Sequence, residues 1–452
     1  MEVLSAHHHF PPSFLWGSTL PGCTELSDRQ VENASGRLFS GAIPAENETQ
    51  TSFWIELLDL VAASGLSSMR IPLDWRILQP EQHSWDKQAV EFYQFLLNEM
   101  VNRDIKPVVV MMSGSLPGWF IELGGWIDSS SIQTFAQYAV YAVDSFGSQV
   151  DVWITMEDPV HTALIEAGIQ SDSMGADKPA ILIRVLKNLL GAHREAYESI
   201  HSEQSALVSY AQWYWPAFAL CPEQVESGIN RRMLSKIQEF YRTGSIEYAG
   251  EKLQVPGYVQ LRDGIALGYA NMAELAPSGL IQPCQREELQ QWDTTTAKVF
   301  EQEGLENLQA AIRWARTLSL PVYIIRHQIF SSDTTVRKRI VFQTLRELWN
   351  FVNESWPVRG YFFHSFIDGR DCDTESAPSP GCSAVISKTG EIRHRPLGDL
   401  YQQICLEEGI SSDLTRTQVP ELYSRYFPGK GPRDLDMRMQ HGEEIETSDL
   451  AD

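Results

Sequence analysis

The sequence predicts an α/β fold, a single (β/α)8 barrel (a TIM barrel), on three observations. Short runs rich in β-branched and aromatic residues recur from about residue 14 onward, and longer segments with helical spacing of apolar residues separate them. Eight such runs occur, and right-handed crossovers between eight parallel strands close most simply into a barrel. No linker rich in proline, glycine or serine divides the 452 residues, so we expect one domain.

Each predicted strand is a short run rich in β-branched and aromatic residues. In chain order they are FLWGSTL (14–20), SMRIPLDW (68–75), PVVVMMS (107–113), VWITME (152–157), ALVSYAQW (206–213), GIALGYA (264–270), PVYIIRH (321–327) and RGYFFHSFI (359–367).

The predicted helices carry apolar residues at intervals of three and four, and each is long enough to cross back over a sheet. They lie at 88–103, 132–146, 180–200, 295–318 and 334–352. We place the barrel at residues 10–428. Residues 429–452 are charged and poor in apolar side chains, so we expect a mobile tail there.

Charge and hydropathy exclude some classes of partner. The chain has 36 Lys+Arg and 59 Asp+Glu, a net charge of -23, which disfavours nucleic-acid binding. No apolar run approaches the ~20 residues that cross a bilayer, so we expect no membrane span. Residues 1–9 have neither a basic start nor a hydrophobic stretch, so we expect no secretory signal, and a plastid protein with this sequence would be a trimmed form.

The cysteine and histidine patterns do not indicate a cofactor. The six cysteines form no C-x-x-C pair, so we expect buried free thiols in a reducing compartment, with no metal and no other cofactor. The histidine run at 7–9 lies near a chain end, where we expect an unstructured segment rather than a metal site.

Several segments together resemble the family 1 glycoside hydrolases, which include the β-glucosidases. The resemblance runs over most of the chain in a consistent order: FPPSFLWG (10–17), MRIPLDW (69–75), SLP (115–117) with GGW (124–126), VWIT (152–155), YII (323–325) and GYFFHS (360–365). It implies the same barrel and a site at the carboxyl ends of its strands.

The resemblance also implies a degenerate catalytic site. Retaining members need two carboxylates about ~5 to 5.5 Å apart. Where the family has Thr-x-Asn-Glu-Pro this chain has TMEDP (155–159), which places Asp158 at the position of the acid/base glutamate. Arg326 stands at the position of the nucleophile, and a guanidinium is always protonated and cannot attack carbon.

The sugar-binding positions are altered as well. Ser113 stands where the family has a sugar-holding histidine, and His364 replaces a tryptophan. Arg70 and Tyr269 are retained, and Asp371 lies in the loop after the last strand. The resemblance therefore implies a vestigial pocket that orients a sugar poorly.

Two arginines in this pocket need compensating carboxylates, because buried unpaired charge is costly. Asp158 and Asp371 are the candidates, and we expect Arg326 to reach Asp158. Glu157 also belongs to the vestigial pocket, but it cannot simply replace Asp158 as the acid/base, because neighbouring residues on a strand face opposite sides.

With catalysis lost, the barrel serves most simply as a scaffold. The resemblance to non-catalytic glycosidase-like subunits implies protein partners in a large thylakoid membrane complex, at the stromal side of the chloroplast. A cytoplasmic location is the alternative. Other readings stay open: a family 1 β-glycosidase or galactolipid-remodelling enzyme, and a stand-alone sugar-binding protein.

Overall fold

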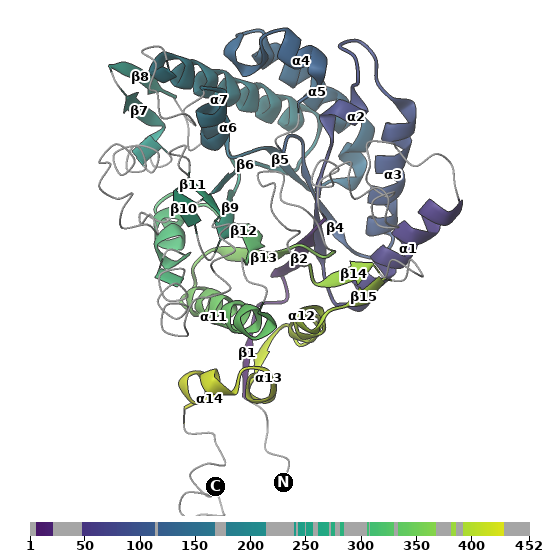
Figure 1. Ribbon diagram of the computed structural model, residues 1–452, viewed down its shortest axis with the longest axis vertical. Helices are drawn as coiled ribbons and strands as arrows, with labels where there is room; N and C mark the ends of the chain where they lie inside the picture. The colour runs from purple at the N-terminus through teal and green to yellow at the C-terminus, as the bar shows by residue number, and fades with distance from the viewer. Residues whose placement is uncertain are drawn as a thin grey trace, which may run out of the picture.

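A computed structural model describes residues 6–20, 48–113, 116–167, 178–213, 239–240, 243–248, 250–255, 261–270, 273–275, 281–283, 305–306, 308–329, 333–367, 381–385 and 392–428. At its centre eight parallel strands close into a barrel in the order β12-β13-β2-β3-β4-β5-β6-β9 (Figure 1). Their bounds are β2 Leu15–Thr19, β3 Ser68–Pro72, β4 Lys106–Val110, β5 Val152–Glu157, β6 Leu207–Trp213, β9 Ile265–Ala270, β12 Val322–Gln328 and β13 Val358–His364. All eight predicted strands are confirmed, as is the single barrel.

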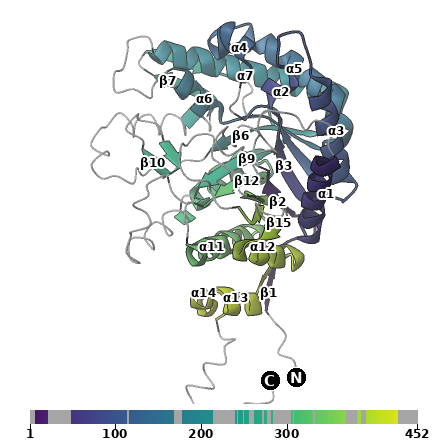
Figure 2. The same ribbon diagram turned by 45° about the vertical axis from the view of Figure 1, so that its right-hand side comes forward.

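Helices surround the barrel (Figures 1 and 2). The main ones are α1 Glu48–Ala63, α3 Lys87–Val101, α5 Ser131–Phe146, α6 Pro159–Glu166, α7 Lys178–Glu203, α11 Thr334–Asn353 and α12 Pro396–Leu406. Four of the five predicted helices match these within a few residues. The fifth, 295–318, lies partly outside the described residues, and its described residues 308–316 are helical.

Shorter elements fill the connections, and the sequence did not predict them. They are the helices α2 Trp75–Leu78, α4 Gly118–Glu122, η3 Gly125–Ile127, η4 Gly147–Gln149, α13 Ser412–Gln418 and α14 Pro420–Tyr426. Two-stranded sheets pair β1 His7–His9 with β16 Gly409–Ser411, β7 Ser245–Tyr248 with β8 Glu251–Gln254, β10 Ala273–Leu275 with β11 Ile281–Pro283, and β14 Ser383–Val385 with β15 Ile392–His394.

The predicted second strand extends too far. It was expected to reach residue 75, but it ends at Pro72 and α2 begins at Trp75. The side chain of Asp74 accepts a hydrogen bond from the backbone N–H of Arg76, which is the N-cap geometry that starts a helix.

Two apolar clusters hold the barrel together. The smaller one fills the interior with side chains from six strands: Val108, Val110, Ile154, Ala211, Ala266, Ile325 and Phe362. Gly17 of β2 lies against this filling, since a Cβ there would come within 2.3 Å of the Phe362 ring. The larger cluster lies between the strands and the surrounding helices. A filled interior leaves the ends of the strands as the place for a site.

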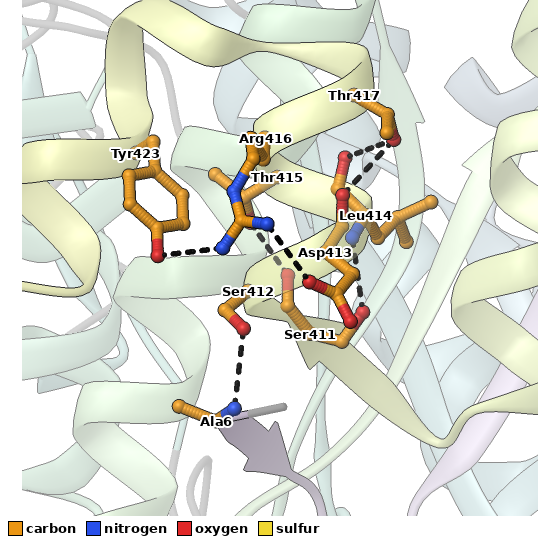
Figure 3. Close-up of polar contacts among 9 residues, drawn as sticks. All are labelled: Ala6, Ser411, Ser412, Asp413, Leu414, Thr415, Arg416, Thr417 and Tyr423. Carbon is orange, nitrogen blue, oxygen red and sulfur yellow. Dashed lines mark hydrogen bonds and ion pairs between the residues drawn. The ribbon is translucent and has the colours of Figure 1, made fainter. Parts of the chain in front are cut away.

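Both ends of the described chain meet below α11 and α12 (Figure 1). Strand β1 pairs antiparallel with β16, and Figure 3 shows the backbone N–H of Ala6 donating to the hydroxyl of Ser412 at 3.1 Å. The ring of His8 lies 4.5 Å from that of Phe427 and 4.4 Å from that of Trp349. The expectation of an unstructured histidine run was therefore wrong, because the pairing and these ring contacts order it.

Several expectations concern residues that lie outside the described ranges. The mobile tail at 429–452 is one, so it stays a prediction. Of the six cysteines, Cys382 and Cys405 are described, and both are buried free thiols. Burial raises the pKa of the Cys405 thiol well above its usual value. No described helix has the length and apolar character of a membrane span.

Candidate functional site

The carboxyl ends of the barrel strands bring five polar side chains together above the apolar interior. Arg70 comes from β3 and Arg326 from β12, and Glu157 ends β5. Thr19 and His364 end the neighbouring strands β2 and β13. This is the end at which barrel enzymes place their sites, so it is the candidate functional site.

Glu157 is the carboxylate that links the two arginines. The Arg70 Nη2 atom donates a short hydrogen bond to Glu157 Oε1. Arg326 Nη1 lies 3.8 Å from the same oxygen. The side chains of Arg70 and Arg326 are only 1% and 4% exposed, and that of Glu157 is 12% exposed. One carboxylate therefore joins two buried guanidinium groups across the mouth of the barrel.

The expected pairing of Arg326 with Asp158 was wrong. Among the described residues, the carboxylate within ion-pair distance of Arg326 is that of Glu157. Asp158 is buried, at 4% exposure, and its backbone adopts a positive φ of 33°. Its carbonyl accepts a hydrogen bond from Thr162 N, and its own N–H donates to the carbonyl of Ala211 on β6, so Asp158 joins the end of β5 to the start of α6.

A bulge in β5 is the physical reason. Ile154 and Glu157 pair with Ser209 and Ala211 of β6, so three steps along β5 match two steps along its neighbour. The extra residue breaks the alternation of faces. Ile154 lies in the interior cluster and Glu157 meets Arg70, whereas Thr155 between them faces outward and contacts His193 of α7. The regular alternation of faces, which would keep Glu157 from taking the place of Asp158, therefore fails at this position.

Strand β12 carries a similar irregularity beside Arg326. Ile324 and Arg326 pair with consecutive residues of β9, Leu267 and Gly268. Ile325 fills the barrel interior, and Arg326 reaches the mouth directly after it. The next residue, His327, turns to the outer side, where its Nδ1 atom lies 2.6 Å from the hydroxyl of Tyr361. Burial lowers the pKa of His327 to about 3.

His364 completes the polar cluster as a neutral imidazole. Its Nδ1 atom lies 2.6 Å from Thr19 Oγ1. The ring is buried, and its pKa lies well below the usual value because of desolvation first and then the positive charges of Arg326 and Arg70. A protonated His364 would add a third cation to the cluster, which explains why the ring stays neutral.

The remaining predicted pocket residues are placed less completely. Ser113 is half-buried just beyond the end of β4. Tyr269 belongs to β9, but its side chain is not among those described. Asp371 lies outside the described residues. Trp126, also retained in the resemblance, is fully buried and packs against Phe120 at 5.2 Å, so it is a core residue.

The described cluster can be compared with the carboxylate pair of a glycosidase. A retaining mechanism needs a carboxylate free to attack and a second one to protonate. Here the carboxylate of Glu157 contacts the guanidinium groups of Arg70 and Arg326. Arg326 also stands where the resemblance places the attacking carboxylate. Within the described residues, no group of three or more histidines, cysteines or acids is arranged to hold a metal ion.

Sequence reasoning named Glu157 as a pocket residue but missed that Glu157, rather than Asp158, is the carboxylate near Arg326. The sequence carries no clear signal for this, because Thr155 and Glu157 alternate with the apolar residues Ile154 and Met156, as in a regular strand. The bulge depends on the register of β5 against β6, which alternation does not reveal.

Comparison with known proteins supports the fold. Residues 52–241 match the family model Glycosyl hydrolase family 1. The cytosolic beta-glucosidase of Cavia porcellus is 24% identical over 227 residues, which cover 47% of this chain and 45% of that protein. The chain thus spans less than half the length of this relative. The beta-galactosidase of Sulfolobus acidocaldarius is 22% identical over 86% of this chain and 91% of its own length.

Solved structures resemble the barrel over nearly its whole length. The beta-glycosidase from Pyrococcus horikoshii aligns with a TM-score of 0.70 at 19% identity, covering 92% of this chain and 100% of its own. A family 1 glucosidase from Thermotoga maritima gives 0.65 at 18% identity, covering 90% and 100%. The chain is a single (β/α)8 barrel with the fold of the family 1 glycosidases, and residues 52–241 carry the sequence match to that family.

Proposed function

We propose that the protein is a non-catalytic member of the family 1 glycoside hydrolases that serves as a structural subunit. The observation that carries the proposal is the engagement of Glu157 by Arg70 and Arg326 at the carboxyl ends of the barrel strands, the end at which barrel enzymes place their sites. A carboxylate between two buried cations is costly to remove, because breaking a buried ion pair takes away a countercharge. Freeing it for chemistry would break its contacts with both buried guanidinium groups.

The finer proposal names the assembly. The protein is the glycosidase-like subunit of subcomplex B of the chloroplast photosynthetic NAD(P)H dehydrogenase-like complex, peripheral on the stromal side of the thylakoid membrane. There it supports the assembly or stability of the complex, and thereby cyclic electron flow around photosystem I. Its support is the resemblance of the sequence, together with a degenerate site, an acidic surface and reduced thiols.

Each of the two catalytic positions holds a residue that is unsuited to the family's reaction. Arg326 stands at the nucleophile position and cannot attack an anomeric carbon. Asp158 at the acid/base position is one methylene shorter than glutamate, and a displacement of ~1 Å can cost ~10²-fold in rate. Its carbonyl already caps α6. A double displacement through these residues has no attacking group.

A glycosidase activity is the second candidate, because relatives of low identity are named beta-glucosidases and beta-galactosidases. The test is hydrolysis of aryl β-glucosides and aryl β-galactosides by the purified protein, beside an active family 1 glucosidase. We expect no turnover above buffer. Turnover that survives Asp158→Asn and Glu157→Gln would point to a contaminant, whereas turnover abolished by them would overturn the non-catalytic proposal.

Stand-alone sugar binding is the third candidate, and calorimetric titration with glucose, galactose and galactolipid head groups tests it. Saturable heat would favour it.

The assembly is tested separately. Native gel fractionation of thylakoids should place the chain in a large complex together with other subunits, and its loss should reduce that complex. Recovery only as a free monomer would contradict the structural role even if the protein is inert towards glycosides.

A further inference from the structure

We propose that residues 6–9 form a strap that acid releases: they close over helices α11 and α14 while the ring of His8 is neutral, and they detach when that ring takes up a proton. Such a device is independent of the catalytic state of the barrel and of any partner subunit. These residues are called the histidine strap below.

The histidine strap is an addition to the barrel rather than a part of it. Its strand β1 pairs with β16 in a two-stranded sheet that is separate from the eight barrel strands. The next residue, Phe10, is buried, and its ring packs against those of Phe14 and Trp16 at 4.5 and 5.0 Å. The apolar core therefore begins to hold the chain at Phe10, so the strap can detach while the core stays intact.

The ring of His8 is the main contact between the strap and the helices. It stacks on the ring of Phe427 at 4.5 Å, with 12° between the planes, and lies 4.4 Å from the ring of Trp349 on α11. Trp349 Nε1 also donates a hydrogen bond to the carbonyl of His9 at 3.0 Å. Figure 2 shows β1 beside α13 and α14, below α11. The strap thus covers aromatic side chains of α11 and of the segment after α14.

A proton on His8 is unfavourable in this position. Both ring nitrogens of a protonated histidine carry hydrogen. The Nδ1 atom of His8 is buried and has no hydrogen-bond partner among the described residues, so it would be a buried donor without an acceptor. The guanidinium group of Arg346 lies over the Trp349 ring, 4.6 Å from its centre. Desolvation first, and then the positive charges of Arg346 and His7, lower the pKa of His8 to about 4.

The acids near the strap act on other groups. Among the described residues, the charges that act on His8 are those of Arg346 and His7, and both are positive. The carboxylate of Glu407 lies 3.4 Å from Nε2 of His7, whose ring stacks on that of His9. The remaining titratable groups on the helices that contact the strap act on one another: Glu347 beside Arg346 on α11, and Arg425 and Tyr426 on α14.

The direction of the pH dependence follows from these contacts. A released His8 takes up a proton near pH 6.5, whereas a docked one does so near pH 4. The closed strap is therefore fully favoured above about pH 6.5 and is lost progressively as the pH falls toward 4. Between pH 7 and pH 5 the equilibrium constant for opening should rise ~20-fold. Opening uncovers the rings of Trp349 and Phe427.

Hydrogen exchange of the full-length protein at pH 7 and pH 5, corrected for the intrinsic exchange rates, tests the strap. Two backbone amides report its closure: Phe10 N–H donates to the carbonyl of Glu408 at 2.9 Å, and Ser412 N–H donates to that of Ala6 at 2.7 Å. We expect their protection to fall ~20-fold from pH 7 to pH 5. His8→Phe keeps a flat ring in place but cannot take up a proton, so the change should shrink to less than ~3-fold.

Matched variants separate His8 from other histidines and from the fold. His83→Phe replaces an exposed histidine outside the strap and should leave the ~20-fold change intact. Arg346→Gln removes the nearby cation and should reduce the change, whereas Arg346→Lys keeps the charge and should retain it. Circular dichroism of each variant verifies that the fold is kept.

The wild-type protein alone can also refute the strap. Equal protection of the two amides at pH 7 and pH 5 would overturn the proposal, as would a His8→Phe variant that is as sensitive to pH as the wild type. The amides of the barrel strand β4 report opening of the whole barrel. Strap amides that exchange as slowly as those of β4 at pH 5 would mean that the strap opens only on global unfolding, which would overturn the proposal too.

Discussion

At the scale of single residues, Glu157 decides the character of the site. One carboxylate oxygen faces two guanidinium groups that are almost completely buried. Removing the carboxylate takes one countercharge away from two buried cations, which is costly in a buried site. The three side chains come from β3, β5 and β12. The two ion pairs that share Glu157 therefore also connect strands that are not neighbours in the barrel.

The first prediction concerns this carboxylate. Glu157→Gln keeps the shape of the side chain but removes its charge, so we expect a loss of about 3 kcal/mol in the free energy of unfolding. Urea denaturation of the full chain measures it. Glu247→Gln is the control, because Glu247 pairs with Lys252 at 4.0 Å in an exposed position and should change stability by less than ~0.5 kcal/mol. Equal effects of the two substitutions would refute the buried linkage.

At the scale of elements, helix positions follow from the sequence while strand irregularities do not. The predicted helix at 88–103 is found as α3, Lys87–Val101, since its apolar spacing and its N-cap agree. Asp86 caps it by accepting a hydrogen bond from the backbone N–H of Ala89 at 2.9 Å. The bulges beside Glu157 and Arg326 were not predicted, because they depend on the register against β6 and β9.

The second prediction concerns the start of α3. Asp86→Ala leaves an amide at the first turn without its side-chain acceptor, so we expect a loss of about 1 kcal/mol in the free energy of unfolding. Asp86→Asn keeps an acceptor and should restore most of that loss. Thermal and urea unfolding of the three proteins side by side would show it, and an alanine variant as stable as the wild type would contradict the capping role.

At the scale of the whole molecule, burial of neutral histidines couples stability to pH. Desolvation lowers the pKa of His193 to about 4 and that of His327 to about 3. His193 Nε2 donates to the carbonyl of Leu261, which fixes the neutral ring beside Thr155. The unfolded chain binds protons on these rings near pH 6.5, but the folded chain does not.

The third prediction follows from that sign. Because the unfolded state binds more protons, stability should be fully present above about pH 6.5 and fall as the pH drops toward 4, by about 1 kcal/mol per pH unit for each such ring. Urea unfolding between pH 7 and pH 5 measures the slope with little carboxylate protonation. His193→Gln removes one of these rings, so the slope of the unfolding free energy against pH should become shallower by the contribution of one bound proton. A free energy of unfolding that does not change over this range would disprove the coupling.

The sequence by itself determined the barrel, its eight strands and most of its long helices, because these depend on local apolar spacing and on the number of strands. It also determined that Arg326 cannot act as a nucleophile, since residue type alone settles that chemistry. Only the tertiary structure decided that Glu157 rather than Asp158 meets Arg326, and that the histidine run near the start forms a strand. Both outcomes depend on registers and partners that are distant in the sequence, where a one-residue bulge reverses the face of every following side chain.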